Sequence, residues 1–279
     1  MLQAPLGVAQ AGRWQDFPQL HEAAQAGSAE AQYDLASLYF HQADGTGDYR
    51  RGIYWYVRAA LGGHVRAQYL LAFLYETGMG VTRDMAQALY WYERAAESGD
   101  ASAQYLLGAY LSGDDPSHHD EVLAAYWLGQ AASRGLAEAQ LALARLYDQG
   151  RGVARDEALA AAWLALAAVQ GLAQAQLELG AFYLEGRGVR QDYYEAMEWF
   201  FKASSQGSAD AQYNLGMMYA YGIGVLRNER RAYRWLRRAA RGGHPRAQRE
   251  IEVLWQRAVL QKRKKPLPET RRARRSLNG

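Results

Sequence analysis

Apolar residues recur at steps of three and four along most of this chain, the spacing expected of helices with one buried face. A first apolar run covers Ala101 to Leu111 and is followed by an Asp-Pro-Ser stretch, which favours a turn. A second run begins at Asp120, a residue suited to capping a helix, and closes at Gly135. The pattern therefore predicts pairs of helices joined by short turns.

This pair repeats along the chain at a fixed interval of 36 residues. Self-similarity at such a period is typical of a stacked array, in which each helix pair buries its apolar face against its neighbours. Three sets of residues keep the interval: Ala-Gln pairs beginning at Ala31, Ala67, Ala103, Ala139, Ala175, Ala211 and Ala247; the tryptophans Trp55, Trp91, Trp127, Trp163, Trp199 and Trp235; and the glycines Gly27, Gly63, Gly99, Gly135, Gly171, Gly207 and Gly243.

Two further sets predict where the helices begin and how they are joined. Asp or Asn precedes each second helix and is expected to accept hydrogen bonds from its first backbone N–H groups. Four joints read Gly-x-Gly-Val, and because no strand precedes them we interpret them as turns rather than phosphate-binding loops. The cap residues are Asp48, Asp84, Asp120, Asp156, Asp192 and Asn228, and the four joints lie at 78–81, 150–153, 186–189 and 222–225.

The combined pattern resembles the Sel1-like repeat family, which is related to tetratricopeptide repeats. Asp210 to Gly243 carries almost every element of that repeat, including Leu215-Gly216, Tyr219 and Trp235. The resemblance covers roughly Ser28 to Gln248. It implies antiparallel helix pairs in a right-handed superhelical α-solenoid and an adaptor or scaffold role.

We therefore expect an all-α solenoid of about six 36-residue helix-turn-helix repeats. Residues 1–27 are predicted to end in a half repeat that covers the first unit, and residues 28–243 hold the six repeats. Residues 244–262 should form a capping helix, whose polar outer face is assigned to Arg249, Glu250, Glu252 and Arg257. Residues 263–279 are predicted to be a basic, disordered tail.

Composition narrows the possible functions. The absence of cysteine excludes disulfides, thiolate zinc sites and cysteine nucleophiles. We expect a cytoplasmic protein because Met1 to Gly12 lacks the basic start and apolar run of a signal peptide, or a periplasmic one if a leader is missing. Ala158 to Val169, the longest apolar run, is too short to span a bilayer.

An exposed column on the first helices suggests where a partner binds. A projection at 100° per residue places this column opposite the invariant positions. Our hypothesis is that its apolar groups anchor a peptide or a partner protein, since exposed apolar clusters tend to mark contact sites. The alternative is that neighbouring first helices bury them. The candidate partner-binding residues are Leu70, Phe73, Leu106, Arg145, Met217 and Tyr221.

A second column, on the second helices, carries Tyr54, Tyr90 and Tyr126. Such a series could stack bases or hold a carbohydrate. We favour packing against neighbouring helices, because the column continues with non-aromatic residues.

Charge is distributed unevenly along the chain. The formal net charge of +3 combines an excess of acidic residues up to Leu226 with an excess of basic residues after it. The basic end is suited to an acidic protein, nucleic acid or an anionic membrane surface, or it serves only solubility. Opposite charge at the two ends also favours head-to-tail self-association. The basic patch comprises Arg230, Arg231, Arg234, Arg237, Arg238, Arg241, Lys262, Arg263, Lys264, Lys265, Arg271, Arg272, Arg274 and Arg275.

Little in the sequence indicates catalysis, and we predict no catalytic residue, metal or cofactor. His118 and His119 are adjacent, without the i, i+4 spacing that places two ligands on one helix face. His64 and His244 occupy equivalent joints, which indicates a structural role. We therefore predict a non-enzymatic scaffold that binds an unknown protein or peptide. The alternative is an adaptor that contacts nucleic acid or an anionic membrane through the basic tail.

Overall fold

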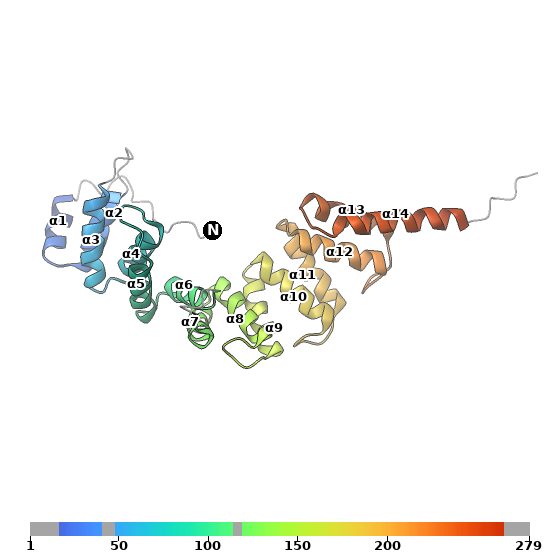
Figure 1. Ribbon diagram of the computed structural model, residues 1–279, viewed down its shortest axis with the longest axis horizontal. Coiled ribbons are helices and arrows are strands. Elements are labelled where there is room, and N and C mark those ends of the chain that lie inside the picture. Colours follow the sequence, from blue (N-terminus) through green and yellow to red (C-terminus); the bar gives the residue numbers. More distant parts are fainter. Residues whose placement is uncertain (1–16, 41–47, 114–118, 265–279) are drawn as a thin grey trace, which may run out of the picture. The chain divides into compact units, whose positions relative to one another are not determined.

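The computed structural model describes residues 17–40, 48–113 and 119–264, with side chains described as far as Arg257. These residues form fourteen α-helices and no strand (Figure 1). The helices are α1 (Phe17–Gln25), α2 (Ala29–Phe40), α3 (Tyr49–Leu61), α4 (Val65–Thr77), α5 (Met85–Glu97), α6 (Ala101–Leu111), α7 (Glu121–Ser133), α8 (Ala137–Gln149), α9 (Glu157–Val169), α10 (Ala173–Glu185), α11 (Tyr193–Ser205), α12 (Ala209–Tyr221), α13 (Glu229–Arg241) and α14 (Ala247–Lys264).

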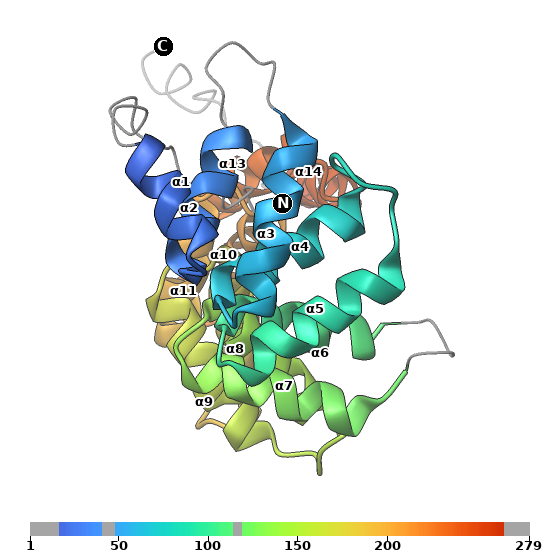
Figure 2. The ribbon, with the colours of Figure 1, turned by 90° about the vertical axis from the view of Figure 1, so that its left-hand side faces the viewer.

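The chain divides into two compact units, Met1–Trp163 and Leu164–Gly279, with the boundary inside α9. In the first unit each helix from α1 to α8 packs against the next, as two views of the ribbon show (Figures 1 and 2). In the second unit the same holds from α10 to α14. The all-α repeat array predicted from the sequence is confirmed. Within the described part of the chain, no helix is both long and apolar enough to cross a bilayer.

The second helices begin where the sequence places their caps. The Asp84 carboxylate accepts from the Gln87 backbone N–H at 3.1 Å, and Asn228 does the same for Arg231 at 3.0 Å. The closing glycines have positive φ, for example +89° at Gly99, a conformation that few residues other than glycine adopt. Both predictions are confirmed, and together they fix the length of each second helix.

The Gly-x-Gly-Val joints are turns, as predicted. Gly78 caps α4 in the left-handed conformation, and Gly80 also has a positive φ of +76°. A Cβ at Gly80 would lie 2.9 Å from the Tyr49 Cβ, so the joint passes close to the preceding second helix. The loop tips of the first and third repeats, at 41–47 and 114–118, lie outside the described residues.

The core is formed where a small residue of each first helix meets a large residue of its second helix. A Cβ at Gly108 would lie 2.7 Å from the Leu128 Cγ, and Gly180 is equally close to the Phe200 ring. The tryptophans lie beside this contact. Trp55 and Trp91 are buried, and the other four of the series are half-buried. The tryptophans of this series therefore face the core rather than solvent.

The Ala-Gln pairs acquire a role that the sequence did not suggest. Gln68 is buried, and its Nε2 donates to the Ala60 carbonyl at 3.1 Å. The same bond, eight residues back along the chain, recurs at Gln32, Gln104, Gln140 and Gln176. Each glutamine thus satisfies a carbonyl near the end of one second helix, where intrahelical partners run out, and ties that helix to the next repeat.

His64 and His244 have the structural role expected of them. His64 Nδ1 accepts from the Ala67 backbone N–H at 3.1 Å, and its ring stacks on Tyr33 with 4.4 Å between centroids. His244 stacks on Tyr213 in the same way at 4.0 Å. His64 is the N-cap of α4, and α14 begins three residues after His244.

Candidate functional site

The proposed partner-binding column on the first helices is largely packed into the core. Leu70 is 4% exposed and belongs to the buried cluster of its unit, so the expectation that it faces solvent is wrong. Leu106 packs against the same cluster, and Phe73 is half-buried. Their surroundings come from other helices of the first unit, which a projection of a single helix leaves out. Burial, the core of the alternative interpretation, holds for Leu70, and Leu106 is partly buried.

The remaining candidates of that column are scattered. Met217 packs against the core of the second unit. Arg145 and Tyr221 are exposed, and the Arg257 guanidinium lies over the Tyr221 ring, 5.0 Å from its centroid. Its Nη2 also donates to the Tyr221 hydroxyl at 3.4 Å. These residues therefore form no continuous apolar surface.

The tyrosines of the second-helix column are about half exposed, so our preference for packing against neighbouring helices is wrong. Tyr54 and Tyr90 each contact the tryptophan that follows them, edge to face. Arg58 Nη1 donates to the Tyr54 hydroxyl at 2.9 Å, and Arg94 holds Tyr90 in the same way. Tyr126 has the same ring contact, but Gln130 replaces the arginine. The column is a series of local pairs.

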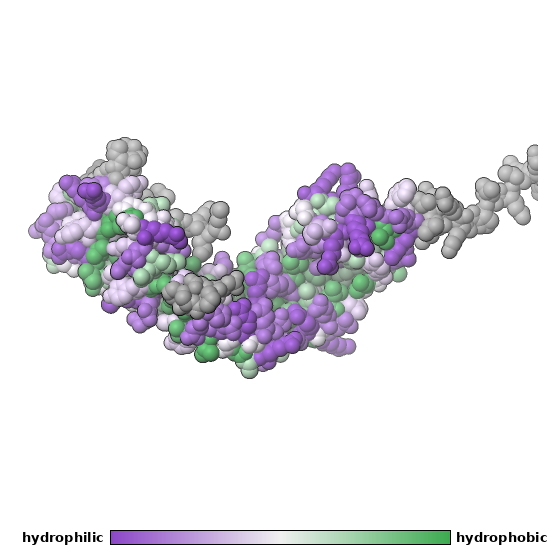
Figure 3. Space-filling view, viewed as in Figure 1, coloured by the Kyte–Doolittle hydropathy of each residue, from purple (hydrophilic) through white to green (hydrophobic). Residues whose placement is uncertain are grey.

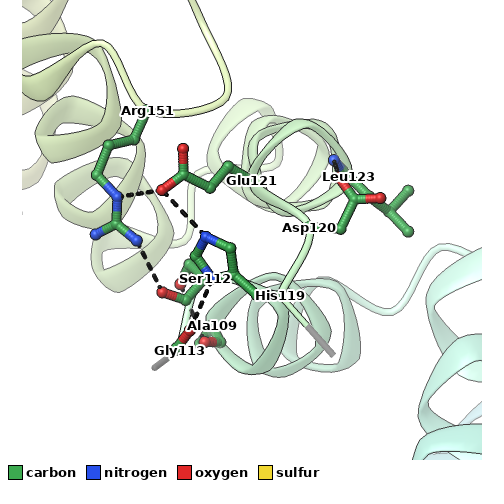
Figure 4. Close-up of polar contacts among 8 residues, drawn as sticks. All are labelled: Ala109, Ser112, Gly113, His119, Asp120, Glu121, Leu123 and Arg151. Carbon is green, nitrogen blue, oxygen red and sulfur yellow. Dashed lines mark hydrogen bonds and ion pairs between the residues drawn. The ribbon is translucent and has the colours of Figure 1, made fainter. Parts of the chain in front are cut away.

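Polar groups gather at the joint between α6 and α7 (Figure 4). Arg151, from the next joint along the chain, donates to Glu121 Oε1 at 2.6 Å and to the Ser112 carbonyl at 3.1 Å. His119 lies 3.3 Å from the same carboxylate, and its other ring nitrogen lies 2.8 Å from the Gly113 carbonyl. The hydrogen bond from Arg151 is the main reason why the pKa of Glu121 is lowered.

This arrangement joins two loops rather than forming a reactive centre. Glu121 and Arg151 link adjacent joints, and Asp120 accepts from the Leu123 backbone N–H as the helix cap. The predicted pair of histidines is only half described, since His118 lies outside the described residues. Among the residues that are described, no three His, Cys, Asp or Glu side chains come close enough to hold a metal ion.

Basic side chains cover α13. Arg230, Arg231, Arg234, Arg237, Arg238 and Arg241 are all exposed on this 13-residue helix, whose one acidic residue is Glu229. Hydrophilic residues dominate the visible surface of this region (Figure 3). Lys262, Arg263 and Lys264 continue α14, which therefore ends slightly beyond its predicted limit. Lys265, Arg271, Arg272, Arg274 and Arg275 lie outside the described residues.

A groove of about 700 Å³ lies between α13 and α14. Trp255 and Tyr233 are its large aromatic residues, and they are 69% and 45% exposed. Arginines of α13 form one edge. Sequence reasoning missed this groove, although Trp255 already stood at a position that holds tyrosine in five of the six repeats. The lining residues are Glu229, Arg230, Tyr233, Arg234, Arg237, Ile251, Glu252, Leu254 and Trp255.

The sequence matches the Sel1 repeat family in six consecutive copies, at residues 29–64, 65–100, 101–136, 137–172, 173–208 and 209–244. No curated protein matches the chain.

Two solved structures extend this similarity. One is a protective antigen from uropathogenic Escherichia coli strains displaying an SLR fold, with 31% identity and a TM-score of 0.77. That alignment covers 87% of this chain and 52% of the antigen, so the chain spans about half of the antigen's length. The other is a Sel1 repeat protein from Oxalobacter formigenes, with 27% identity, a TM-score of 0.64 and coverage of 81% and 98%.

Proposed function

This chain belongs to the Sel1 repeat family, whose members generally act as protein-interaction scaffolds, and on that premise we propose that it is a non-enzymatic scaffold that binds an acidic protein at its C-terminal repeat. The observation that carries the proposal is the exposed row of six arginines on α13. The rest of the chain up to Leu226 is acidic, so an acidic partner is attracted to this end and repelled elsewhere.

The contacts of these arginines support a binding role. Arg238 lies over the Trp235 ring with 4.8 Å to the centroid, and Arg231 lies over Tyr219 at 5.5 Å. Such contacts place one face of each guanidinium group against an aromatic ring, while both arginines remain exposed to a partner. Guanidinium groups held in this way suit bidentate recognition of carboxylates.

The polar contacts at the joint between α6 and α7 support a non-catalytic role. Glu121 and Arg151 bond to each other, and His119 lies beside a loop carbonyl. Every one of these groups holds a loop, and none of them pairs a nucleophile with a base.

The test is affinity capture from a cell lysate with the full chain and a charge-reversed variant, Arg230→Glu with Arg234→Glu and Arg237→Glu. A matched control reverses three exposed arginines elsewhere: Arg50→Glu, Arg66→Glu and Arg190→Glu. We expect the first variant to lose a set of acidic proteins that both the unaltered chain and the control retain. Binding should weaken as salt is added, because exposed charges are screened.

Two results would overturn the proposal. One is equal retention of the same proteins by all three forms of the chain. The other is capture that disappears after nuclease treatment, or that is replaced by salt-sensitive binding to anionic vesicles. That second outcome would favour an adaptor for nucleic acid or membranes, the alternative function that the sequence also suggested.

A further inference from the structure

The groove between α13 and α14 lies where a seventh second helix would pack. Trp255 of α14 corresponds, 36 residues on, to Tyr219 of α12 and to Tyr39 of α2. Those two tyrosines are 7% exposed, and each lies beneath an arginine of its own second helix, Arg231 and Arg51 respectively. Trp255 is 69% exposed, because α14 has no second helix after it among the described residues.

The α13 side of the groove also holds positions that another helix covers in the preceding repeat. Arg237 corresponds to Phe201 of α11, whose ring contacts Trp235 of the next second helix at 5.6 Å. Tyr233 corresponds to Met197, which is 8% exposed, whereas Tyr233 is 45% exposed. Both sides of the groove therefore present positions that a further helix covers in the complete repeats.

From this correspondence we propose that the groove binds an amphipathic acidic helix of a partner protein, which takes the place of a second helix that the described residues do not supply. The inference rests on the proposed function and names the structure that the acidic partner presents. We choose a helix as the occupant because a helix covers the equivalent positions of both α13 and α14 in the preceding repeats. Its acidic character follows from Arg230, Arg234 and Arg237 along the α13 edge.

Two occupants from this chain itself fit less well. The segment from Lys262 to Arg275 carries the same charge as the α13 edge and is repelled by it. Helix α1 of a second copy is also a lone second helix, but it has nine residues where the others have thirteen, and it has no acidic residue in its first turn.

Glu252 adds a requirement for the occupant. Its position holds glycine or alanine in all six repeats, where the second helix crosses the first most closely. The large residue that normally fits there, such as Phe200 against Gly180, would bury the Glu252 carboxylate without a partner. The occupant therefore carries lysine or arginine at that point, which pairs with Glu252.

The chain supplies a probe of the right pattern. A synthetic peptide of Asp192–Ser205 with blocked ends carries three acidic residues and one lysine, and its second version has Phe200→Lys. A third version adds Met197→Pro to the lysine peptide, which keeps the charge but breaks the helix. Binding to the full chain is measured by fluorescence anisotropy or titration calorimetry.

We expect the lysine peptide to bind the full chain about fivefold more tightly than the Phe200 peptide, and the proline version to bind hardly at all. In the Glu252→Ala variant, the preference for the lysine peptide over the Phe200 peptide should vanish or reverse, because alanine restores the small residue found in the other repeats. Trp255→Ser should weaken binding about tenfold. Leu226→Ser, at a residue that is 92% exposed and does not line the groove, is the control and should change binding less than twofold.

The inference is overturned if the proline and lysine peptides bind equally, or if Trp255→Ser and Leu226→Ser behave alike. Concentration-dependent sedimentation that Trp255→Ser abolishes would also overturn it, in favour of a second copy. The proposed function can survive these failures. It stands if the charge-reversed variant still loses acidic proteins that Trp255→Ser retains, since the arginines then act without the groove.

Discussion

Helices α12 and α14 occupy the same place in successive repeats and differ in what covers them. In α12, Leu215 is fully buried, Gly216 touches the second helix and Tyr219 is 7% exposed. The same positions of α14 hold Ile251, Glu252 and Trp255, and the last of these is 69% exposed. The first residue stays apolar in both helices, while the second changes from the smallest side chain to a charged one.

This difference shows which positions depend on the covering helix. Leu254 of α14 is 6% exposed, like its counterpart Met218, and both belong to the buried cluster of the second unit. Glu252 and Trp255 differ from their counterparts because they line the groove, which no second helix of the described residues covers. The size and charge of the side chain at a repeat position therefore depend on the helix that contacts it. The α14 positions that lack a covering helix within the described chain are the ones that we propose recognise another molecule.

The largest expected effect comes from filling the helix crossing of α12. In Gly216→Leu the new Cβ would lie 2.7 Å from the Leu236 Cγ and 3.2 Å from its backbone nitrogen, so α12 and α13 must separate. We expect the free energy of unfolding of the second unit to fall by about 3 kcal/mol, even though leucine favours helix more than glycine does. Urea unfolding followed by circular dichroism measures the change.

The matched control is Glu252→Leu at the same position of α14. Because Glu252 is exposed, this change should alter the free energy of unfolding by less than about 0.5 kcal/mol. Similar losses in the two variants would show that α14 is covered as α12 is, and the distinction between the two helices would fail.

A smaller effect is expected at the glutamine that links one repeat to the next. Gln176 is 5% exposed, donates to the Ala168 carbonyl at 3.1 Å and accepts from Gln206 Nε2 at 2.9 Å. Gln176→Ala should lower the free energy of unfolding by about 2 kcal/mol, because buried polar groups lose their partners. Gln248, at the same position of α14, is exposed, and Gln248→Ala should cost less than about 0.5 kcal/mol. Equal losses of unfolding free energy in the two variants would contradict the conclusion that this position of α14 is exposed.

The complete repeats could be predicted from the sequence because repetition separates signal from chance. A single Asp such as Asp84 is weak evidence for a helix cap, but five aspartates and one asparagine in register establish one, and the hydrogen bond from Gln87 follows. The role of the glutamine column could not be predicted, since its partner is a carbonyl on another helix. Nothing in the residue type reveals that contact.

The binding residues were predicted less well, for a physical reason. Leu70 was assigned to solvent from the angles of one helix, whereas it is buried in a cluster to which several helices of the first unit contribute. Glu252 was assigned to a polar outer face, whereas it lines the groove beside Trp255. The sequence did contain a signal for the groove, because Glu252 departs from a position that is otherwise glycine or alanine. A charged residue at a position that otherwise holds glycine or alanine indicates that no second helix of the described chain packs against it.

The smallest expected effect tests how Arg231 contributes to covering Tyr219. It compares two arginines of the first turn of α13. Arg231 lies over the Tyr219 ring with 5.5 Å to the centroid, whereas Arg230 lines the groove. Since both residues lie near the same helix end, Arg231→Ala and Arg230→Ala remove the same charge from a similar position in the helix dipole. Arg231→Ala should be less stable by about 0.5 kcal/mol, the value of an exposed cation–π contact. Replicate urea midpoints of the two variants measure this difference directly, and each variant serves as the control for the other. No difference, or a larger loss for Arg230→Ala, would mean that Tyr219 owes its burial to α13 as a whole rather than to the arginine above it.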